Sequence, residues 1–233
     1  MFNPNLPKVL VPVAGKPMIL HLLRQVKKIK PDPVIVLGYK ASMVKKILGG
    51  SDKSPKFAYQ KSLLGTAHAV LCAKPKIQAE NILVLYGDMP LVSSGSMLKI
   101  LRQHQKSGLK FSMFTSFVPS FLGKYQTFNS FGRIIRNSRK VAEIKESKDA
   151  SAAQLGIREI NPGIYVFNSN WLWQAIKHLK NNNSQREYYL TDLVAEARRQ
   201  KLQIGAIKLP LKELWGINTR DDLLAVESLL RKR

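Results

Sequence analysis

The sequence is poor in cysteine, in acidic residues and in long apolar runs. Its 233 residues include a single cysteine, Cys72, which excludes an internal disulfide and favours a reducing compartment. No apolar stretch is long enough to cross a bilayer, and residues 1–5 lack the basic-then-apolar layout of a secretory signal. These absences predict a cytoplasmic protein with no membrane partner. Cys72 itself, inside an apolar stretch, is expected to be a small buried hydrophobe.

The shortage of acidic residues leaves a strong excess of positive charge. The chain has 15 Asp and Glu against 38 Lys and Arg, a formal net charge of +23. Such a chain attracts polyanions. Its basic clusters are short, as at Lys27-Lys28 and Lys45-Lys46, and none is interleaved with aromatic residues as in a single-strand-binding surface. We therefore interpret the charge as basic surface and do not favour nucleic acid as a partner.

The first half of the chain alternates between strand-like and helix-like apolar patterns. Residues 33–38 and 81–88 are short, nearly continuous apolar runs, typical of strands buried on both faces in a parallel sheet. Helical patterns occupy residues 18–29, 66–74 and 96–105. With 45% hydrophobic residues and no linker or repeat, one mixed α/β domain over residues 1–233 is expected.

The second half contains more strands. Residues 111–118 and 161–167 are expected strands, and residues 132–136 and 141–144 a hairpin across the polar turn 137–140. Helical patterns follow at residues 171–179, 190–200 and 221–230, with a strand predicted at residues 203–207.

Four short features have the chemistry of a phosphate or sugar site, and each has a structural alternative. Asp88 follows an apolar strand, where a Mg²⁺ ligand or a turn aspartate is equally well placed. Gly65-Thr66 opens a helix, either to hold an anion or simply to cap it. Lys8, after Pro7, suits a phosphate but equally a basic surface, and Asn218 suits a metal shell or a turn. His68 is expected to be structural, because no second ligand stands at metal-binding spacing.

Taken together and in order, these features resemble a known family. The sequence is similar, over essentially its whole length, to the uridylyltransferase domain of bacterial bifunctional UDP-N-acetylglucosamine pyrophosphorylase / glucosamine-1-phosphate acetyltransferases, of the sugar nucleotidyltransferase family. The matching stretches are Leu6-Pro7-Lys8, Leu64-Gly65-Thr66-Ala67-His68-Ala69, Tyr86-Gly87-Asp88-Met89-Pro90-Leu91, Phe131-Gly132-Arg133-Ile134, Glu146-Ser147-Lys148-Asp149-Ala150, Glu159-Ile160-Asn161, Glu187-Tyr188-Tyr189-Leu190-Thr191-Asp192 and Gly216-Ile217-Asn218.

The resemblance implies a fold and a reaction. The fold is a Rossmann-like mixed α/β sheet of the nucleotidyltransferase, glycosyltransferase-A-like type, with a small β lobe. The reaction is Mg²⁺-dependent, in-line transfer of a uridylyl group from UTP to N-acetylglucosamine-1-phosphate, giving UDP-N-acetylglucosamine, a cell wall precursor, and pyrophosphate. Such catalysis consists of positioning and charge neutralisation.

The resemblance also implies roles for individual residues. Lys8 and Asp88 are the expected catalytic residues, and Asp88 and Asn218 the expected Mg²⁺ ligands. The nucleotide is expected at Lys8, Gln60, Gly65 and Thr66, with Lys8 at its phosphates and the other three residues around the uracil base. The sugar is expected at Tyr86, Gly87, Gly132, Glu146, Asn161, Tyr189 and Thr191.

The sequence departs from the family pattern in several places. The family opens with a central strand and a Leu-x-x-Gly-x-Gly-Thr-Arg-Met loop, and Met1 stands about where the final methionine of that loop would be. Neighbouring strands would then keep unpaired edges. Leu63 replaces a usual glutamine, and Pro162 follows Asn161. The acetyltransferase half, a left-handed β-helix, is also absent, so a separate acetyltransferase is a candidate partner.

Three interpretations besides this enzyme stay open. The chain could be another sugar-1-phosphate nucleotidyltransferase with a different base or sugar. It could be a catalytically impaired relative that still binds a sugar nucleotide. The third alternative, a basic nucleic-acid binder, predicts binding that falls steeply with salt.

Overall fold

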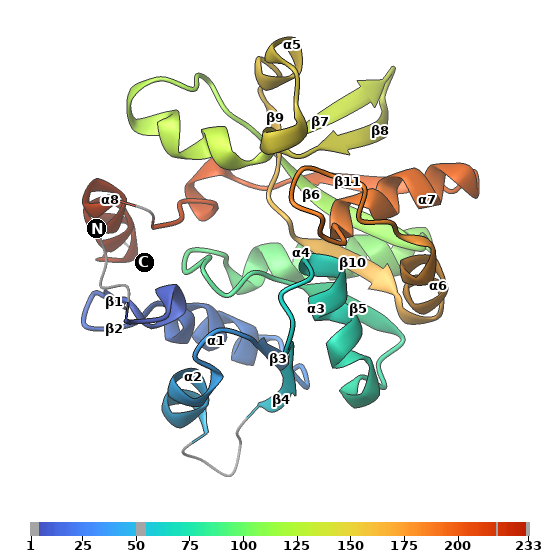
Figure 1. The fold of residues 1–233 in the computed structure, drawn as a ribbon. Helices are drawn as coiled ribbons and strands as arrows, with labels where there is room; N and C mark the ends of the chain where they lie inside the picture. The colour runs from blue at the N-terminus through green and yellow to red at the C-terminus, as the bar shows by residue number, and fades with distance from the viewer. Residues whose placement is uncertain (1–4, 50–54, 218, 232–233) are drawn as a thin grey trace.

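The computed structural model describes residues 5–49, 55–217 and 219–231 of the chain, which form alternating helices and strands (Figure 1). Within them the α-helices are α1 (Met18–Lys28), α2 (Ala41–Leu48), α3 (Thr66–Ala73), α4 (Ser94–Ser107), α5 (Ala152–Leu155), α6 (Ser169–Ala175), α7 (Leu193–Arg199) and α8 (Arg220–Arg231). The strands are β1 (Pro12–Val13), β2 (Lys16–Pro17), β3 (Val34–Leu37), β4 (Lys56–Tyr59), β5 (Asn81–Val84), β6 (Phe111–Phe117), β7 (Gly132–Asn137), β8 (Lys140–Lys145), β9 (Glu159–Asn161), β10 (Tyr165–Asn168) and β11 (Ile204–Lys208). Short 3₁₀ segments are η1 (Lys8–Leu10), η2 (Lys74–Lys76), η3 (Gly123–Ser130), η4 (Ser147–Asp149), η5 (Ile176–His178), η6 (Leu190–Asp192) and η7 (Leu211–Glu213).

A seven-stranded mixed sheet organises the fold, as expected for a Rossmann-like α/β protein. Its strands run in the order β5-β10-β6-β9-β7-β8, and β11 pairs with β6 in parallel. The remaining pairs in this sheet are antiparallel. The strand predicted at residues 81–88 is therefore present as β5, but its neighbour β10 is antiparallel rather than parallel.

The strand predicted at residues 161–167 is interrupted. β9 ends at Asn161 and β10 begins at Tyr165, and both pair with β6. Pro162 has no N–H for a ladder hydrogen bond, and Gly163 takes a φ of +74°, a conformation that favours glycine. This break redirects the chain, so that β9 pairs with the hairpin β7–β8 instead of continuing in the main part of the sheet.

The hairpin β7–β8 and β9 form the small β lobe, at the top of Figure 1. The turn is the predicted one at residues 137–140, where Ser138 has a φ of +54°. Helix α7 packs beside β8, and Arg198 of α7 donates a hydrogen bond of 2.8 Å to the carbonyl of Ala142. The lobe is thus attached both to the sheet and to a helix of the main body.

Strands β3 and β5 each keep one edge that no described strand occupies. β3 pairs in parallel with β4 in a separate two-stranded sheet, and β5 stands at the end of the seven-stranded sheet. Val34, Ile35 and Val36 remain partly exposed although they are wholly apolar. These strands are therefore less buried than their sequence predicts, and the expectation that a missing strand leaves them unpaired stays a prediction.

Buried apolar side chains lie on both faces of the large sheet. One cluster joins Phe111, Tyr165 and Phe167 of the strands to Trp171 of α6 and Leu193 of α7. A second joins the opposite face to α1 and α4, and two smaller ones lie under α2 and α8. The predicted helices α1, α3, α4 and α8 are all present, and each covers one of these clusters.

The two ends of the described chain lie side by side (Figure 1). Glu227 of α8 accepts a hydrogen bond of 2.8 Å from the backbone N–H of Ala14, in the turn between β1 and β2. Among the described residues, every helix is too short or too polar to traverse a lipid bilayer.

Candidate functional site

Lys8 and Asp88 meet beyond the carboxyl end of β5. The Lys8 Nζ lies 2.7 Å from Asp88 Oδ2, and both side chains remain partly exposed, at 42% and 34%. Pro7 precedes η1 and Lys8 is its first residue, so the lysine is held on a defined turn. In open α/β sheets this end of the strands is where ligands bind. The two residues predicted to be catalytic are therefore adjacent.

Gly87 allows these two segments to approach each other. A Cβ at this position would lie 3.3 Å from Cγ1 of Val9, the residue after Lys8. A larger residue would push the segment that carries Asp88 away from η1. The absence of a side chain at Gly87 thus allows the segments that carry Lys8 and Asp88 to lie close together.

The Tyr86 phenol is influenced by the charges of two acidic residues, Glu146 and Asp88. Burial, the negative charge of Glu146 and, more weakly, that of Asp88 raise the pKa of the Tyr86 phenol above its usual value. The phenol is therefore a protonated hydrogen-bond donor at neutral pH. Its ring packs on Gly163 so closely that a Cβ there would lie 2.0 Å from Cε2 of Tyr86.

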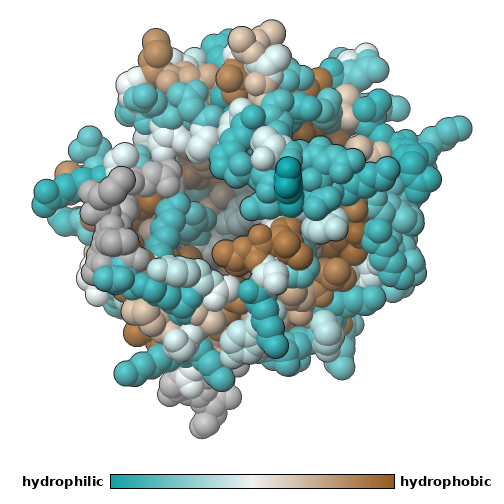
Figure 2. Space-filling view, in the orientation of Figure 1, coloured by the Kyte–Doolittle hydropathy of each residue, from teal (hydrophilic) through white to brown (hydrophobic). Residues whose placement is uncertain are grey.

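An acidic hollow of about 690 Å³ opens between the β lobe and the loop before η6. Figure 2 shows that this side of the molecule is hollowed near its centre. The residues that line the acidic hollow are Glu143, Ile144, Lys145, Glu146, Asp149, Asn181, Asn182, Asn183, Ser184, Arg186, Tyr189, Thr191 and Asp192. Carboxylates and amides dominate this lining, so it offers many acceptors to a ligand rich in hydroxyl and N–H groups.

The carboxyl groups in the acidic hollow influence one another. Burial raises the pKa of Glu146; the Thr191 hydroxyl acts in the opposite direction, and Asp192 and Asp149 raise it further. Burial and Asp149 also raise the pKa of Asp192. Among the described residues, the buried Thr191 Oγ1 has no partner within hydrogen-bond geometry, although it lies close enough to Glu146 to favour its ionised form. A buried hydroxyl in this state is available to a ligand.

The loop over residues 181–186 forms one wall of the acidic hollow and is fastened to η4. The N–H of Ser184 donates to Asp149 Oδ1 at 3.1 Å, and Lys148 Nζ donates to Gln185 Oε1 at 2.6 Å. Glu146, the residue that follows β8, also lines the acidic hollow. This wall is therefore tied to the segment that carries the central carboxylate.

Gly132 and Asn161 stand at paired positions of β7 and β9, next to Glu146. A Cβ at Gly132 would lie 3.4 Å from Glu146 Oε2 and 3.3 Å from the carbonyl of Lys145. Asn161 uses both ends of its amide inside the protein. Its Nδ2 donates to the buried Tyr165 hydroxyl at 2.6 Å, and its Oδ1 accepts from the N–H of Gly163 at 3.0 Å. Asn161 thus fixes the Pro162-Gly163 break on which Tyr86 rests.

The predicted base-binding residues lie around the start of α3. Gln60 Nε2 is 2.9 Å from the carbonyl of Gly65 and 3.0 Å from Nδ1 of His68. Gly65 has a φ of +102°, and a Cβ there would lie 2.6 Å from the carbonyl oxygen of Tyr188. The structural role expected for His68 agrees with its contact to Gln60. Cys72, with Sγ 3.8 Å from Nε2 of His68, is partly exposed, so the expected full burial is wrong.

The predicted Mg²⁺ site has one of its two protein ligands in the described part of the chain. Asp88 offers a partly exposed carboxylate, 2.7 Å from the Lys8 ammonium, and a carboxylate is a ligand type that Mg²⁺ prefers. Asn218 lies outside the described residues. No group of three or more His, Cys, Asp or Glu in the described residues could enclose a metal. The donor set fits an ion completed by substrate oxygens and water.

Sequence reasoning missed much of the acidic hollow. It assigned no site role to Asp149, Asp192 or Arg186, and it placed Tyr165 in a strand without a role. The signals were present: Asp149 follows Glu146 by three residues and Asp192 follows Thr191 directly. The polar run Asn181-Asn182-Asn183-Ser184 has the composition of a connecting loop, whereas it lines the acidic hollow.

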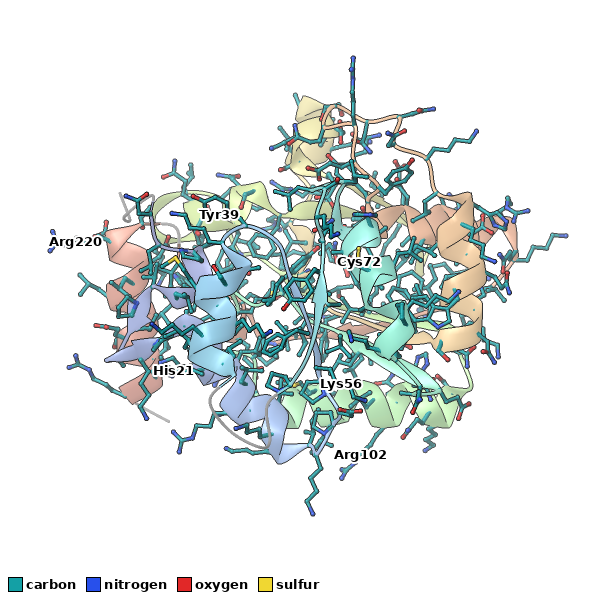
Figure 3. The ribbon with its side chains drawn as sticks, turned by 60° about the horizontal axis from the view of Figure 1, so that its bottom comes forward. His21, Tyr39, Lys56, Cys72, Arg102 and Arg220 are labelled. Carbon is teal, nitrogen blue, oxygen red and sulfur yellow. The ribbon has the colours of Figure 1, made fainter. Side chains whose placement is uncertain are left out.

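The surface charge is dispersed, as the sequence indicated. Arg102 of α4, Lys56 of β4 and Arg220 of α8 lie on separate elements, and Figure 3 shows Arg220 at the left edge of the molecule and Arg102 at the bottom. No basic side chain lines the acidic hollow except Lys145 and Arg186, among the residues that the structure describes.

Comparison with known proteins points to one family. The family described as nucleotidyl transferase matches residues 4–215 of the chain. Bifunctional protein GlmU of Thermoanaerobacter pseudethanolicus is 38% identical over 230 residues, covering 97% of this chain and 48% of the relative. Bifunctional protein GlmU of Shouchella clausii is 37% identical over 231 residues, covering 97% of this chain and 49% of the relative. The chain spans about half the length of these curated relatives.

Solved structures share the fold. UDP-glucose pyrophosphorylase in complex with UDP-glucose matches with a TM-score of 0.74 at 15% identity, covering 100% of this chain and 94% of that one. A putative glucose-1-phosphate thymidylyltransferase from Bacillus anthracis also matches with a TM-score of 0.74, at 19% identity, covering 97% of this chain and 87% of that one.

Proposed function

The chain belongs to the nucleotidyl transferase family, and we propose on this basis that it transfers a uridylyl group from UTP to N-acetylglucosamine-1-phosphate. The products are UDP-N-acetylglucosamine and pyrophosphate. The specific substrates follow from the resemblance to GlmU proteins, at 35–38% identity, and from the chemistry of the site. A cell wall precursor pathway and a separate acetyltransferase partner belong to the same proposal.

The observation that carries the proposal is the presence of two half-sites of unlike charge. One holds Asp88 with Lys8, a carboxylate beside a cation, and the other holds Glu146 in the acidic hollow. Phosphate groups suit the first half-site, because Lys8 supplies positive charge there. An uncharged sugar suits the second, because carboxylates accept hydrogen bonds from hydroxyl and amide N–H groups but repel phosphate. A sugar phosphate can bridge the two.

Within this proposal each residue has a definite task. Lys8 binds nucleotide phosphate, and Asp88, with Asn218, holds Mg²⁺, which when bound neutralises phosphate charge. Gln60 and Gly65 bind the base through their amide and backbone groups. Glu146, Tyr189 and Thr191 accept and donate hydrogen bonds to the sugar, while Gly132 leaves room for it beside Glu146.

The chemistry requires no protein nucleophile. The phosphate of the sugar attacks the α-phosphorus of the nucleotide in line, and pyrophosphate leaves. The protein contributes by aligning the attacking oxygen with the leaving group and by balancing negative charge.

The test is pyrophosphate release from UTP and N-acetylglucosamine-1-phosphate with Mg²⁺. The same assay is run with a panel of other nucleoside triphosphates and other sugar-1-phosphates, and on a version extended upstream by an in-frame Gly-x-Gly-Thr-Arg segment. Turnover that needs both UTP and N-acetylglucosamine-1-phosphate supports the proposal. A preference for another pair moves the assignment to that pair. Binding of UDP-N-acetylglucosamine without turnover in either version contradicts the proposed enzyme activity.

A further inference from the structure

Two segments far apart in sequence are joined at the boundary between the half-sites. The base-side segment (residues 64–67) opens α3, and the sugar-side loop (residues 187–192) enters the acidic hollow. The N–H of Tyr188 donates to the carbonyl of Leu64 at 2.8 Å, and the N–H of Ala67 donates to the carbonyl of Tyr188 at 2.9 Å. Two backbone hydrogen bonds therefore join the start of α3 to the sugar-side loop.

Gly65 makes this pairing possible. A Cβ at Gly65 would lie 2.6 Å from the carbonyl oxygen and 2.8 Å from the nitrogen of Tyr188, and 2.8 Å from Cβ of Glu187. The backbone of the base-side segment is thus in van der Waals contact with the sugar-side loop, and one cannot shift without the other.

The side chain of Thr66 adds the contact closest to the acidic hollow. Its Oγ1 accepts a hydrogen bond of 2.9 Å from the N–H of Leu190, the residue between Tyr189 and Thr191. Burial and Glu146 raise the pKa of the Tyr86 phenol, and the Thr66 side chain acts in the opposite direction. Leu190 belongs to the sugar half of the site, although Thr66 itself belongs to the base half.

We propose that Thr66 is a positioning residue for the sugar rather than a contact to the base. Its hydroxyl holds the backbone of Leu190 in place, and thereby positions the neighbouring Tyr189 and Thr191 for the sugar. This inference rests on the proposed function for the identity of the ligands. It deepens that function, because it makes the base-side segment and the sugar-side loop one mechanical unit.

The decisive comparison is between Thr66→Val, which keeps the shape of the side chain and removes the hydroxyl, and Thr66→Ser, which keeps the hydroxyl. Binding of three probes is measured by calorimetry: UTP, N-acetylglucosamine-1-phosphate and UDP-N-acetylglucosamine. Losing a hydrogen bond of this kind costs about 1–2 kcal/mol, or roughly 5–30-fold. Thr66→Val is expected to weaken N-acetylglucosamine-1-phosphate and UDP-N-acetylglucosamine about 10-fold and UTP less than about 3-fold. Thr66→Ser is expected to restore both sugar ligands.

Ser112→Ala is the matched control. Ser112 is buried, whereas Thr66 is half-buried, and the Ser112 hydroxyl lies 2.8 Å from His104 Nδ1, near Asn81 at the start of β5 and away from Asp88. It should lower the melting temperature without distinguishing the sugar ligands from UTP. A Thr66→Val variant that weakens UTP as much as the sugar ligands, or that weakens neither, overturns the proposal.

A second measurement does not depend on the identity of the ligands. Amide hydrogen exchange of the unliganded protein should be faster over residues 187–192 in Thr66→Val than in the original chain, and normal again in Thr66→Ser. Unchanged exchange over this loop overturns the positioning role. Faster exchange in a chain that binds none of the three probes leaves Thr66 as a positioning residue and removes the proposed substrates instead.

Discussion

Lys8 and Asp88, eighty residues apart in sequence, form an ion pair of 2.7 Å at the point where β5 ends. Because both side chains are partly exposed, the pair itself contributes at most about 1 kcal/mol to folding stability. We therefore expect the Lys8–Asp88 pair to matter for ligand binding and catalysis and to contribute little to the stability of the fold. Comparing the rate and the melting temperature of a variant tests this expectation.

Replacing Asp88 with asparagine should abolish most of the activity and leave the fold intact. The amide keeps the shape of the carboxylate and loses its charge, and one preorganised electrostatic contact is worth roughly 3 kcal/mol in the transition state, or about 100-fold in kcat. We expect the rate of pyrophosphate release to fall at least about 100-fold with a melting temperature within about 2 °C of the original.

Lys56→Ala is the control for that experiment. Lys56 forms an ion pair of 2.5 Å with Asp32, also on the surface, but away from the site. Its loss should change neither rate nor melting temperature appreciably. If Asp88→Asn lowers the melting temperature strongly, or retains the rate, Asp88 is a structural residue.

Removing divalent cations should stop turnover without unfolding the protein. The described residues contain no group of three or more His, Cys, Asp or Glu that could enclose a metal, so we expect chelation to leave the fold intact. Excess EDTA is expected to reduce pyrophosphate release to background, and added Mg²⁺ to restore it, with circular dichroism unchanged throughout. Activity that persists in EDTA would contradict the proposed metal dependence.

Glu146→Gln should stabilise the protein at neutral pH and weaken sugar binding. Burial raises the pKa of Glu146 in the folded state. The contribution of the Glu146 carboxyl group to folding stability is therefore fully present below its unfolded pKa of about 4.3, where the group is protonated. That contribution is lost as pH rises through the pKa of the folded state. A neutral glutamine avoids that loss, so the gain in melting temperature should be present at about pH 7.5 and absent near pH 4.

Glu146→Gln should weaken the binding of the sugar substrate, although it increases the stability of the fold. A hydrogen bond to a charged group is worth about 1.5–3 kcal/mol, so the KM for N-acetylglucosamine-1-phosphate should rise roughly 10–100-fold. Glu143→Gln, at the exposed rim of the acidic hollow, is the control for charge alone, since its side chain is 46% exposed. A gain in melting temperature from Glu146→Gln that is larger at acid pH than at neutral pH contradicts the stated sign.

Gly163→Ala should displace Tyr86 and impair the sugar half of the site. The added Cβ would lie 2.0 Å from the tyrosine ring, and the φ of +74° adds strain. Backbone strain costs about 1–2 kcal/mol and overpacking a further 1–3 kcal/mol. Gly108→Ala separates the two causes, because Gly108 has a φ of +63° with nothing within 4 Å of a Cβ. Equal loss of stability in both variants would show that the contact with Tyr86 is unimportant.

Much of the fold follows from apolar periodicity. The helix α1 and the hairpin β7–β8 are predicted almost to their ends, because an amphipathic period and a polar turn are local properties. The break at Pro162-Gly163 is not predicted, because the flanking residues have the pattern of one continuous strand. Whether a strand there pairs with β7, as β9 does, or with β5, as β10 does, depends on residues far away in the sequence. The antiparallel partner of β5 was likewise outside what a single run of apolar residues can indicate.

The site was predictable where motifs carry it and unpredictable where tertiary contacts do. Lys8, Asp88 and Glu146 were named from the sequence, and the structure pairs Lys8 with Asp88 and places Glu146 in the acidic hollow. The hydroxyl of Thr66, by contrast, is engaged by Leu190, which lies 124 residues away. No local pattern reports such a bond. Asp149 and Asp192 were not predicted for the same reason, because they become site residues only when the folded chain brings them into the wall of the acidic hollow.

The edges of β3 and β5 that no described strand occupies have a consequence for handling the protein in solution. Strand edges without a strand partner, beside partly exposed apolar residues such as Ile35 and Val36, can act as templates for intermolecular pairing. A net charge of +23 keeps molecules apart at low ionic strength, but the range of that repulsion shrinks to about 10 Å at 0.1 M salt and about 3 Å at 1 M. Self-association should therefore grow with added salt, the reverse of what a purely charge-driven aggregate would do, and light scattering across a salt series would follow it. Colloidal behaviour in this protein thus depends on the same basic residues whose number exceeds the needs of the site.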